Sequence, residues 1–179
     1  QKLATGATWS EGPVYLPEED CVIWSDIPGN RLLRWSEKEG MSVYLGSAQF
    51  QNGHTLDLQG RILACSHGKR CVERLEKDGT WTTLVASYAG KKLNSPNDIV
   101  VKSDGTIWFT DPSYGLTQSD EGYGGEQEQD GCYVYRFDLA TSEISAVVTY
   151  MVKPNGLAFS PDEKILYVSD TGASHEPDG

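Results

Sequence analysis

The stretch KPNGLAFSPDEKILYVSD, residues 153–170, decides the fold because a similar phrase, SPNDIVVKSDGTIWFTD, occupies residues 95–111. Each copy places Pro-Asn ahead of a short apolar run, turns through a polar tip that contains Asp, and returns along a second run rich in aromatic and β-branched residues. Two such runs joined by a polar turn are typical of an antiparallel hairpin. The repetition predicts that one structural unit recurs along the chain.

Two further copies bring the unit starts to Glu11, Asn52, Asn97 and Asn155, which are spaced 41, 45 and 58 residues apart. A polar, glycine-rich insertion, Gln118 to Asp130, lengthens the last interval. In the first three units a third and a fourth strand follow, in NRLLRWS and MSVYLG, KRCVERLE and WTTLVA, and GCYVYRFD and EISAVVT. Four antiparallel strands in about 40–45 residues are typical of a β-propeller blade.

We therefore predict an all-β chain that forms about the first three and a half blades of a six-bladed β-propeller, with no convincing helix. A β-sandwich with coincidental turns is the alternative. Propellers close with about four to eight blades, and a half-made blade leaves unpaired strand edges. We accordingly expect residues 1–179 to be the N-terminal portion of a single propeller domain, whose remainder is missing or lies on another chain.

The charge balance narrows the classes of partner. The formal net charge is −11, from 26 acidic and 15 basic residues, so nucleic acid and anionic membrane surfaces would be repelled. The sequence holds no apolar run of about 18 residues, so we expect no membrane-spanning helix. A cation is a more natural partner, although most of the acidic residues are expected simply to be solvated surface. A bacterial cytoplasmic and a periplasmic location both fit the sequence.

The four cysteines show no CxxC spacing, which argues against a zinc or redox motif. Cys65 and Cys71 flank the tip SHGKR, where a disulfide across a hairpin is one interpretation. Buried free thiols are the interpretation we favour.

The polar residues that open the units are the candidate metal ligands. In a propeller the first strand of each blade lines the central axis, so Glu11, Asn52, Asn97 and Asn155 are expected to converge although they lie far apart in sequence. A carboxylate and several amide carbonyls offer oxygen ligands, which suit Ca²⁺ or Mg²⁺. The alternative is that each Asn only forms a turn and that Glu11 is a surface acid.

Further polar residues are candidates for the rim of the same funnel. His54, His67 and Asp26 are such candidates, with a structural role as the favoured alternative, and we add Asp170. The insertion, with Tyr114 and Tyr123 beside it, is a candidate lid that grips a sugar ring. Surface disorder is the alternative for the insertion.

The phrases SEGPVY, NSPNDIVVKSDGTIWFTDPSYG, KPNGLAFSPDEKILYVSDTG and ASHEPDG resemble the gluconolactonase, senescence-marker-protein and luciferin-regenerating-enzyme-like family of six-bladed propellers, most closely its bacterial gluconolactonase-like branch. The resemblance covers nearly the whole chain. It implies an axial divalent metal, with Ca²⁺ expected first and Zn²⁺ or Mg²⁺ as alternatives, held by Glu11 and Asn155. Asn97 would contact the metal or orient the substrate. The general-base Asp of the family belongs to a segment outside this chain, and Asp178 is not assigned that role because it lies a blade too early.

The resemblance also implies the reaction. The expected function is a metal-dependent hydrolase that opens a sugar-acid or similar lactone, with the metal polarising the carbonyl and a carboxylate activating water. Animal lactonases of the family carry an Arg two residues before the Asn97 position, whereas this chain has Ser95, which puts aldonolactone specificity in doubt. The alternatives are a phosphotriesterase-like hydrolase on the same metal site and a non-catalytic binding propeller with a structural ion.

Overall fold

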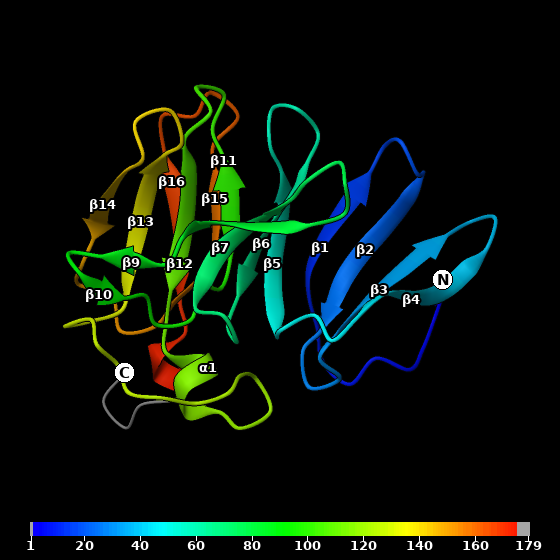
Figure 1. Cartoon of the computed structure of the whole chain (residues 1–179), viewed down its shortest axis with the longest axis horizontal. Coiled ribbons are helices and arrows are strands. Elements are labelled where there is room, and N and C mark those ends of the chain that lie inside the picture. Colours follow the sequence, from blue (N-terminus) through cyan, green and yellow to red (C-terminus); the bar gives the residue numbers. More distant parts are fainter. Residues whose placement is uncertain (1, 175–179) are drawn as a thin grey trace.

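A computed structural model describes residues 2–174, which form five sheets of antiparallel strands, four of which are the repeated units. We call them units 1 to 4 and call their opening strands the first strands (Figure 1). Unit 1 contains β1 (Ser10–Leu16), β2 (Cys21–Asp26), β3 (Arg31–Ser36) and β4 (Gly40–Gly46); unit 2 contains β5 (Gln51–Leu56), β6 (Ile62–Ser66), β7 (Cys71–Leu75) and β8 (Trp81–Val85). Unit 3 contains β11 (Ile99–Val101), β12 (Ile107–Asp111), β13 (Tyr133–Asp138) and β14 (Glu143–Val148), and unit 4 contains β15 (Pro154–Phe159) and β16 (Leu166–Asp170).

Three small elements complete the described part of the chain. The hairpin of β9 (Ser87–Tyr88) and β10 (Lys91–Lys92) joins units 2 and 3, α1 (Tyr114–Thr117) follows β12, and a 3₁₀ turn (Gly172–Ser174) follows β16. Within the described residues no helix is long and apolar enough to cross a membrane. The predicted all-β architecture of antiparallel strands is confirmed; the β9–β10 hairpin and the single turn of α1 are additions that the repeat did not indicate.

The sheets stand side by side, so that the core lies between neighbouring units (Figure 1). In β2 the alternate residues Cys21 and Ile23 pack toward unit 2, where Leu32 joins them. A larger cluster fills the space between units 2 and 3, with ten buried side chains: Leu63, Cys65, Val72, Val85, Leu93, Ile99, Ile107, Phe109, Tyr135 and Phe137. Each large apolar side chain buried in this way stabilises the fold by about 1.5–3 kcal/mol. All four cysteines are buried free thiols, as expected.

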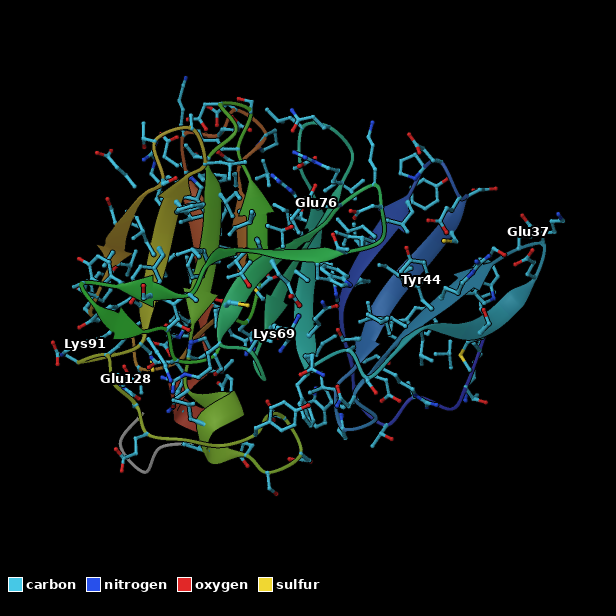
Figure 2. All side chains as sticks on the ribbon, in the orientation of Figure 1. Glu37, Tyr44, Lys69, Glu76, Lys91 and Glu128 are labelled. Carbon is cyan, nitrogen blue, oxygen red and sulfur yellow. The ribbon has the colours of Figure 1, made fainter. Side chains whose placement is uncertain are left out.

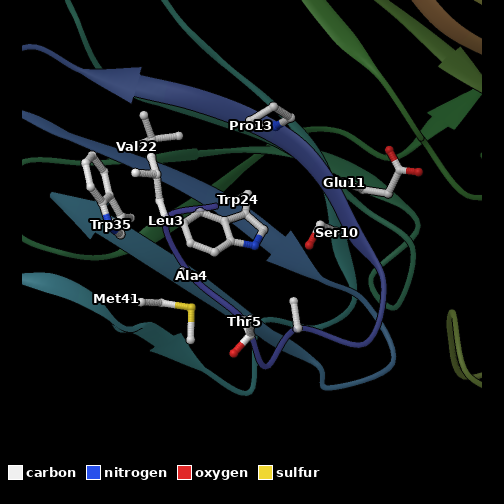
Figure 3. A pocket seen from close by; sticks show the side chains of 11 residues that line it. Leu3, Ala4, Thr5, Ser10, Glu11, Pro13, Val22, Trp24, Trp35 and Met41 are labelled. Atoms are coloured by element: carbon white, nitrogen blue, oxygen red, sulfur yellow. The ribbon is translucent and has the colours of Figure 1, made fainter. Parts of the chain in front are cut away.

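The outer face of unit 1 is also apolar. Val22 and Trp24 alternate with the residues that face unit 2, so they point to the opposite side of the sheet. With Trp35 and Met41 they line a cavity of about 430 Å³, across which the segment 3–7 runs (Figure 3). A sheet face with two tryptophans is of the kind that packs against another sheet.

The first strands of successive units approach so closely that a side chain does not fit between them. A Cβ on Gly12 would lie 2.1 Å from the carbonyl oxygen of Asn52, and one on Gly53 would lie 2.5 Å from that of Asn97. The Gly53 N–H donates to the same Asn97 oxygen at 2.7 Å. Glycine therefore follows Glu11 and Asn52 because the neighbouring backbone occupies the place of a side chain.

Hydroxyl groups add a second link between units at an equivalent place. Ser25, near the end of β2, donates its Oγ hydrogen to the Asn52 carbonyl at 2.9 Å. Thr110, near the end of β12, donates its Oγ1 hydrogen to the Asn155 carbonyl at 2.6 Å. These bonds tie the second strand of one unit to the first strand of the next.

An aspartate ends the second strand in units 1, 3 and 4, and in each case it binds the chain that leads into the first strand. Its carboxylate accepts hydrogen bonds from backbone N–H groups two or three residues before Glu11, Asn97 or Asn155. Asp26 accepts from Thr8 and Trp9, Asp111 accepts from Asn94, and Asp170 accepts from Val152 and Lys153, at 2.8–3.1 Å. The repeated aspartate is thus a clamp on the first strand, and unit 2 has His67 in its place.

The close approach of the first strands gives a stability prediction. Replacing Gly53 by Ala forces its Cβ against the backbone of the next unit, because the nearest atoms are 2.5 and 2.7 Å away. We expect the free energy of unfolding to fall by about 1–3 kcal/mol, the usual cost of overpacking. Gly46→Ala is the matched control, since nothing lies within 4 Å of its added Cβ. Urea denaturation of both variants tests this; equal stabilities would show that the strands have room.

Candidate functional site

One cavity lies where the first strands meet, and we call it the hub cavity. It has a volume of about 510 Å³. Its lining consists of Trp9, Glu11, Ile27, Asn52, Asn97, Tyr114, Glu121, Asn155, Gly156, Ser169 and Thr171. The structure therefore brings together all four residues that open the units, one from each unit, although Glu11 and Asn155 are 144 positions apart in the sequence.

Irregular strand pairing turns these side chains toward the cavity. The β1–β2 ladder shifts register between Glu11 and Val14, and the β15–β16 ladder shifts between Pro154 and Leu157. The β5–β6 ladder shifts at the same place of its unit, between Gln51 and His54. A local irregularity of this kind re-aims a side chain that strict alternation would direct elsewhere.

His67 holds two of the amides. Its Nδ1 lies 3.0 Å from the carbonyl oxygen of Glu121, which only accepts, so Nδ1 carries the hydrogen. Burial lowers the pKa of His67 to about 4, so the ring is neutral and Nε2 is an acceptor. The Nδ2 groups of Asn52 and Asn97 lie 3.4 and 3.5 Å from Nε2 and donate to it. Both amides therefore keep the oxygen Oδ1 for the cavity.

The third amide is anchored in the same manner by unit 4. Asn155 donates from Nδ2 to the Thr171 hydroxyl at 3.4 Å. Tyr114 hydrogen-bonds the same hydroxyl from the side of α1, and Thr171 donates onward to the Lys153 carbonyl. Within the described residues no hydrogen bond engages the Oδ1 of Asn155, so this oxygen too remains a potential ligand.

Two carboxylates line the cavity. Glu11 accepts a hydrogen bond from the indole nitrogen of Trp9 at 3.1 Å on one oxygen. Glu121 comes from the insertion after α1, and burial, followed by the charges of Asp120 and Glu11, raises its pKa above the ordinary value. No sequence pattern singles out Glu121, because it lies in a polar insertion outside the repeat; the loop conformation brings it to the cavity.

Most residues of the insertion are exposed, but two places along it contact units 2 and 3. At the first place, outside the cavity lining, the Tyr123 ring packs edge-on against Phe50 at 5.0 Å, and its hydroxyl donates to Gln49. Further on, the Gln129 amide donates to three carbonyls of the β9–β10 hairpin, and Glu128 accepts from the Lys92 N–H at 2.9 Å at the same edge, where Figure 2 labels Lys91 and Glu128. The segment thus rests on units 2 and 3 at these places, and among its residues Glu121 lines the hub cavity.

The remaining candidates lie elsewhere. His54 is buried behind the cavity and donates from Nδ1 to the Gly12 carbonyl at 2.9 Å. Asp26 and Asp170 clamp backbone N–H groups and are not part of the cavity lining. Ser95 is fully buried; it donates to the Pro112 carbonyl at 2.6 Å and accepts from the Gly115 N–H. Asp178 lies outside the described residues.

The donor set of the cavity consists of oxygens. Among residues 2–174 no group of three or more His, Cys, Asp or Glu side chains could hold a metal ion. The hub cavity instead combines the Glu11 carboxylate with the carbonyl oxygens of three amides, Asn52, Asn97 and Asn155. Oxygen ligands of mixed charge are those that hard divalent cations take, Ca²⁺ above all.

Comparison with known proteins places the chain in a family. Residues 9–175 match the family described as the SMP-30/Gluconolactonase/LRE-like region. The gluconolactonase of Zymomonas mobilis is 33% identical over 183 residues, which cover 94% of this chain and 51% of that protein. The solved structure of a gluconolactonase from Xanthomonas campestris superimposes with a TM-score of 0.90 at 44% identity, over 94% of this chain and 57% of that one.

A more distant solved structure, a calcium-binding regucalcin from Agrobacterium tumefaciens, shares the fold with a TM-score of 0.66 at 18% identity, over 93% of this chain and 52% of that one. The chain thus shares an all-β fold of antiparallel strands with these solved structures. The chain belongs to the SMP-30/gluconolactonase/LRE-like family. It spans about half the length of the gluconolactonase from Zymomonas mobilis.

The two buried histidines predict how stability depends on pH. Burial lowers the pKa of both His54 and His67 from 6.5 to about 4. The unfolded chain therefore binds more protons between pH 6.5 and 4, so stability is fully present above pH 6.5 and is lost as the pH falls toward 4. Asp111 has the opposite effect on stability. Burial raises its pKa to about 7, so the folded chain takes up this proton more readily than the unfolded chain and gains stability as the pH falls below 7.

Burial also raises the pKa values of Asp98 and Glu121, which act in the same direction as Asp111. We expect the two histidines to dominate, so that the free energy of unfolding falls between pH 6.5 and 4. Asp111→Asn removes one opposing group, and its stability should fall more steeply over the same range. Urea denaturation at a series of pH values measures both curves. A wild-type curve that is flat or rises toward pH 4 would contradict the neutral, buried state of the histidines.

Proposed function

We propose that this chain forms part of a metal-dependent hydrolase that opens a sugar-acid or similar lactone. The observation that carries the proposal is the convergence of Glu11, Asn97 and Asn155 on one cavity, with each amide nitrogen anchored away from it. The gluconolactonase relatives from Zymomonas and Xanthomonas support the reaction class. The pentonolactonase XacC of Haloferax volcanii, 25% identical over 172 residues, supports it as well.

We also propose that units 1 to 4 are the first three and a half blades of a six-bladed β-propeller, so that residues 1–179 are the N-terminal portion of one propeller domain. The sequential contacts of β1 with β5, β5 with β11 and β11 with β15 support this, since a propeller joins its blades in this way at the axis. The apolar outer face of unit 1 supports it too, because a neighbouring blade covers such a face.

The hub cavity fits a hard divalent cation better than a soft one. Glu11 supplies a negative oxygen, and the three anchored amides supply neutral oxygens that add no mutual repulsion. Zn²⁺ favours imidazole and thiolate ligands, and the described cavity lining contains neither. We therefore propose Ca²⁺ as the resident ion, with Mg²⁺ and Zn²⁺ as alternatives to be compared.

Several residues that line the hub cavity have a proposed role in hydrolysis. When bound, the ion supplies Lewis acidity that polarises the carbonyl of the lactone. Glu11 and Asn155 hold the ion, and Asn97 orients the substrate carbonyl or completes the ligand set. The Trp9 and Tyr114 rings form walls against the sugar ring, and the insertion that carries Glu121 excludes water from above.

The reaction adds water to the lactone carbonyl carbon and breaks the bond from that carbon to the ring oxygen, which yields a hydroxy acid. A carboxylate takes a proton from the attacking water, and the ring oxygen gains one as it leaves. We propose that this base is the family aspartate that lies outside the present chain.

The substrate preference is proposed to differ from that of the animal lactonases. Ser95 stands where those enzymes carry an Arg, and its hydroxyl is engaged with the Pro112 carbonyl and the Gly115 N–H. No cationic group from this position reaches a sugar acid. Lactones with fewer anionic or polar substituents are therefore expected to be accepted along with aldonolactones.

Glu11→Gln tests the metal role of the carboxylate. The substitution keeps the size of the side chain and removes its negative charge, so we expect the content of bound divalent metal to fall and kcat/KM for a lactone to drop by about 100-fold or more, since the Lewis acid supplies several kcal/mol. Titrimetric lactone hydrolysis and elemental analysis of the full-length protein measure both. Glu18→Gln, on the exposed β1–β2 turn, is the matched control. Full activity and metal content in Glu11→Gln would overturn the assignment.

A side-by-side assay separates the proposed reaction from its alternatives. We expect the full-length protein to turn over δ- and γ-lactones faster than phosphotriesters, by at least about tenfold in kcat/KM, and to lose this activity when a chelator removes the ion. Faster phosphotriester hydrolysis would favour the phosphotriesterase alternative. No turnover of either class, with the ion retained, would favour a non-catalytic binding propeller.

A further inference from the structure

The repeat departs from its own pattern at one residue beside the hub cavity. Units 1, 3 and 4 end the second strand with an aspartate that clamps backbone N–H groups ahead of the first strand. Unit 2 has His67 at this place, and the ring makes no such clamp; its nitrogens face Glu121, Asn52 and Asn97 instead.

In unit 2 other groups accept hydrogen bonds from the backbone N–H groups at the start of the first strand. The Phe50 N–H donates to the side chain of Asn30 at 2.9 Å, and the Gln51 N–H donates to the Ala48 carbonyl at 3.1 Å. Gln49 and Phe50 both adopt a left-handed backbone, with φ near +55° and +51°. This conformation is costly for residues other than glycine and tends to occur at functional sites. The backbone N–H groups of Phe50 and Gln51 therefore need no acceptor from the His67 side chain.

We propose that His67 is a positioning residue that sets the orientation of the Asn52 and Asn97 amides. The Glu121 carbonyl fixes the hydrogen on Nδ1, and the neutral ring then offers only a lone pair at Nε2. An acceptor at this place binds the amide nitrogens and leaves both Oδ1 atoms toward the cavity. The proposal rests on the proposed function, in which those oxygens meet a divalent cation.

The surroundings of His67 make the ring rigid enough for this role. It is 1% exposed, and a Cβ on Gly115 would lie 2.7 Å from the His67 Cβ. A Cβ on Gly122, next to Glu121, would lie 2.2 Å from the Gly115 carbonyl oxygen. The loop that carries Glu121 is thus packed onto α1 and onto the ring, so the seating of the loop and the orientation of both amides depend on one another through His67.

The test compares two variants by isothermal titration of the metal-depleted, full-length protein with Ca²⁺. His67→Phe keeps a planar ring and removes the acceptor, so we expect Ca²⁺ affinity to fall about 10- to 100-fold, as is usual when a partner of a metal ligand is lost. His67→Gln offers an acceptor oxygen and an N–H donor, and should stay within about threefold of the wild type. Val72→Ala, a buried change in the same unit without contact to the cavity, controls for loss of stability.

A double-variant comparison separates positioning from a general packing effect. In a background of Asn52→Ala and Asn97→Ala there are no amides to orient, so His67→Phe should cause little further loss of Ca²⁺ affinity. An undiminished loss in that background overturns the proposal, and so does wild-type affinity in His67→Phe. An affinity of His67→Gln as low as that of His67→Phe, at unchanged thermal stability, also overturns it. If the wild type binds none of Ca²⁺, Mg²⁺ and Zn²⁺, both the proposal and the proposed metal-dependent function fail.

Discussion

The backbone-to-backbone approach of the first strands is the constraint on which the structure depends. The Gly53 N–H meets the Asn97 carbonyl at 2.7 Å, and neither Gly12 nor Gly53 has room for a Cβ. Sheets that fan out from such a tight seam bury apolar side chains farther out, between Ile23, Leu63 and Phe109 and their neighbours. In units 1 and 2 the residue just before the crowded glycine, Glu11 or Asn52, presents its side chain to the hub cavity.

The chemical character of the cavity follows from charge. Four carboxylates brought to one point would repel one another and resist ionisation. Among the four residues that open the units, one glutamate and three asparagines give the same number of oxygen-bearing side chains with a single charge, and Glu121 of the insertion adds a second carboxylate to the lining. An amide, however, presents either an oxygen or a nitrogen, so its usefulness depends on what holds the other end. Thr171 and His67 hold the nitrogens, and the residues that support the site are therefore as informative as those that line it.

The alignment of the repeated units predicted the strands and the convergence of Glu11, Asn97 and Asn155. Equivalent positions of a repeat occupy equivalent places in the fold. The alignment did not distinguish the roles of the residues that end the second strands. Asp26 and Asp170 were candidates for the rim, whereas their carboxylates clamp backbone N–H groups. His67 looked like one more rim candidate, and its contacts with two amides and the Glu121 carbonyl became visible only in three dimensions.

By itself the sequence determined the antiparallel units, their order and the oxygen-rich residues that open them, because turn signals and strand alternation are local and repeat at a regular spacing. The tertiary structure alone decided which way each amide faces, that Ser95 is buried in a backbone network, and that Glu121 of the insertion reaches the cavity. These features depend on contacts between residues up to 74 positions apart, such as that of Tyr123 with Gln49, or 54 apart for His67 with Glu121. Hydrogen-bond direction and loop packing at that range are set by the surrounding atoms, and no local pattern encodes them.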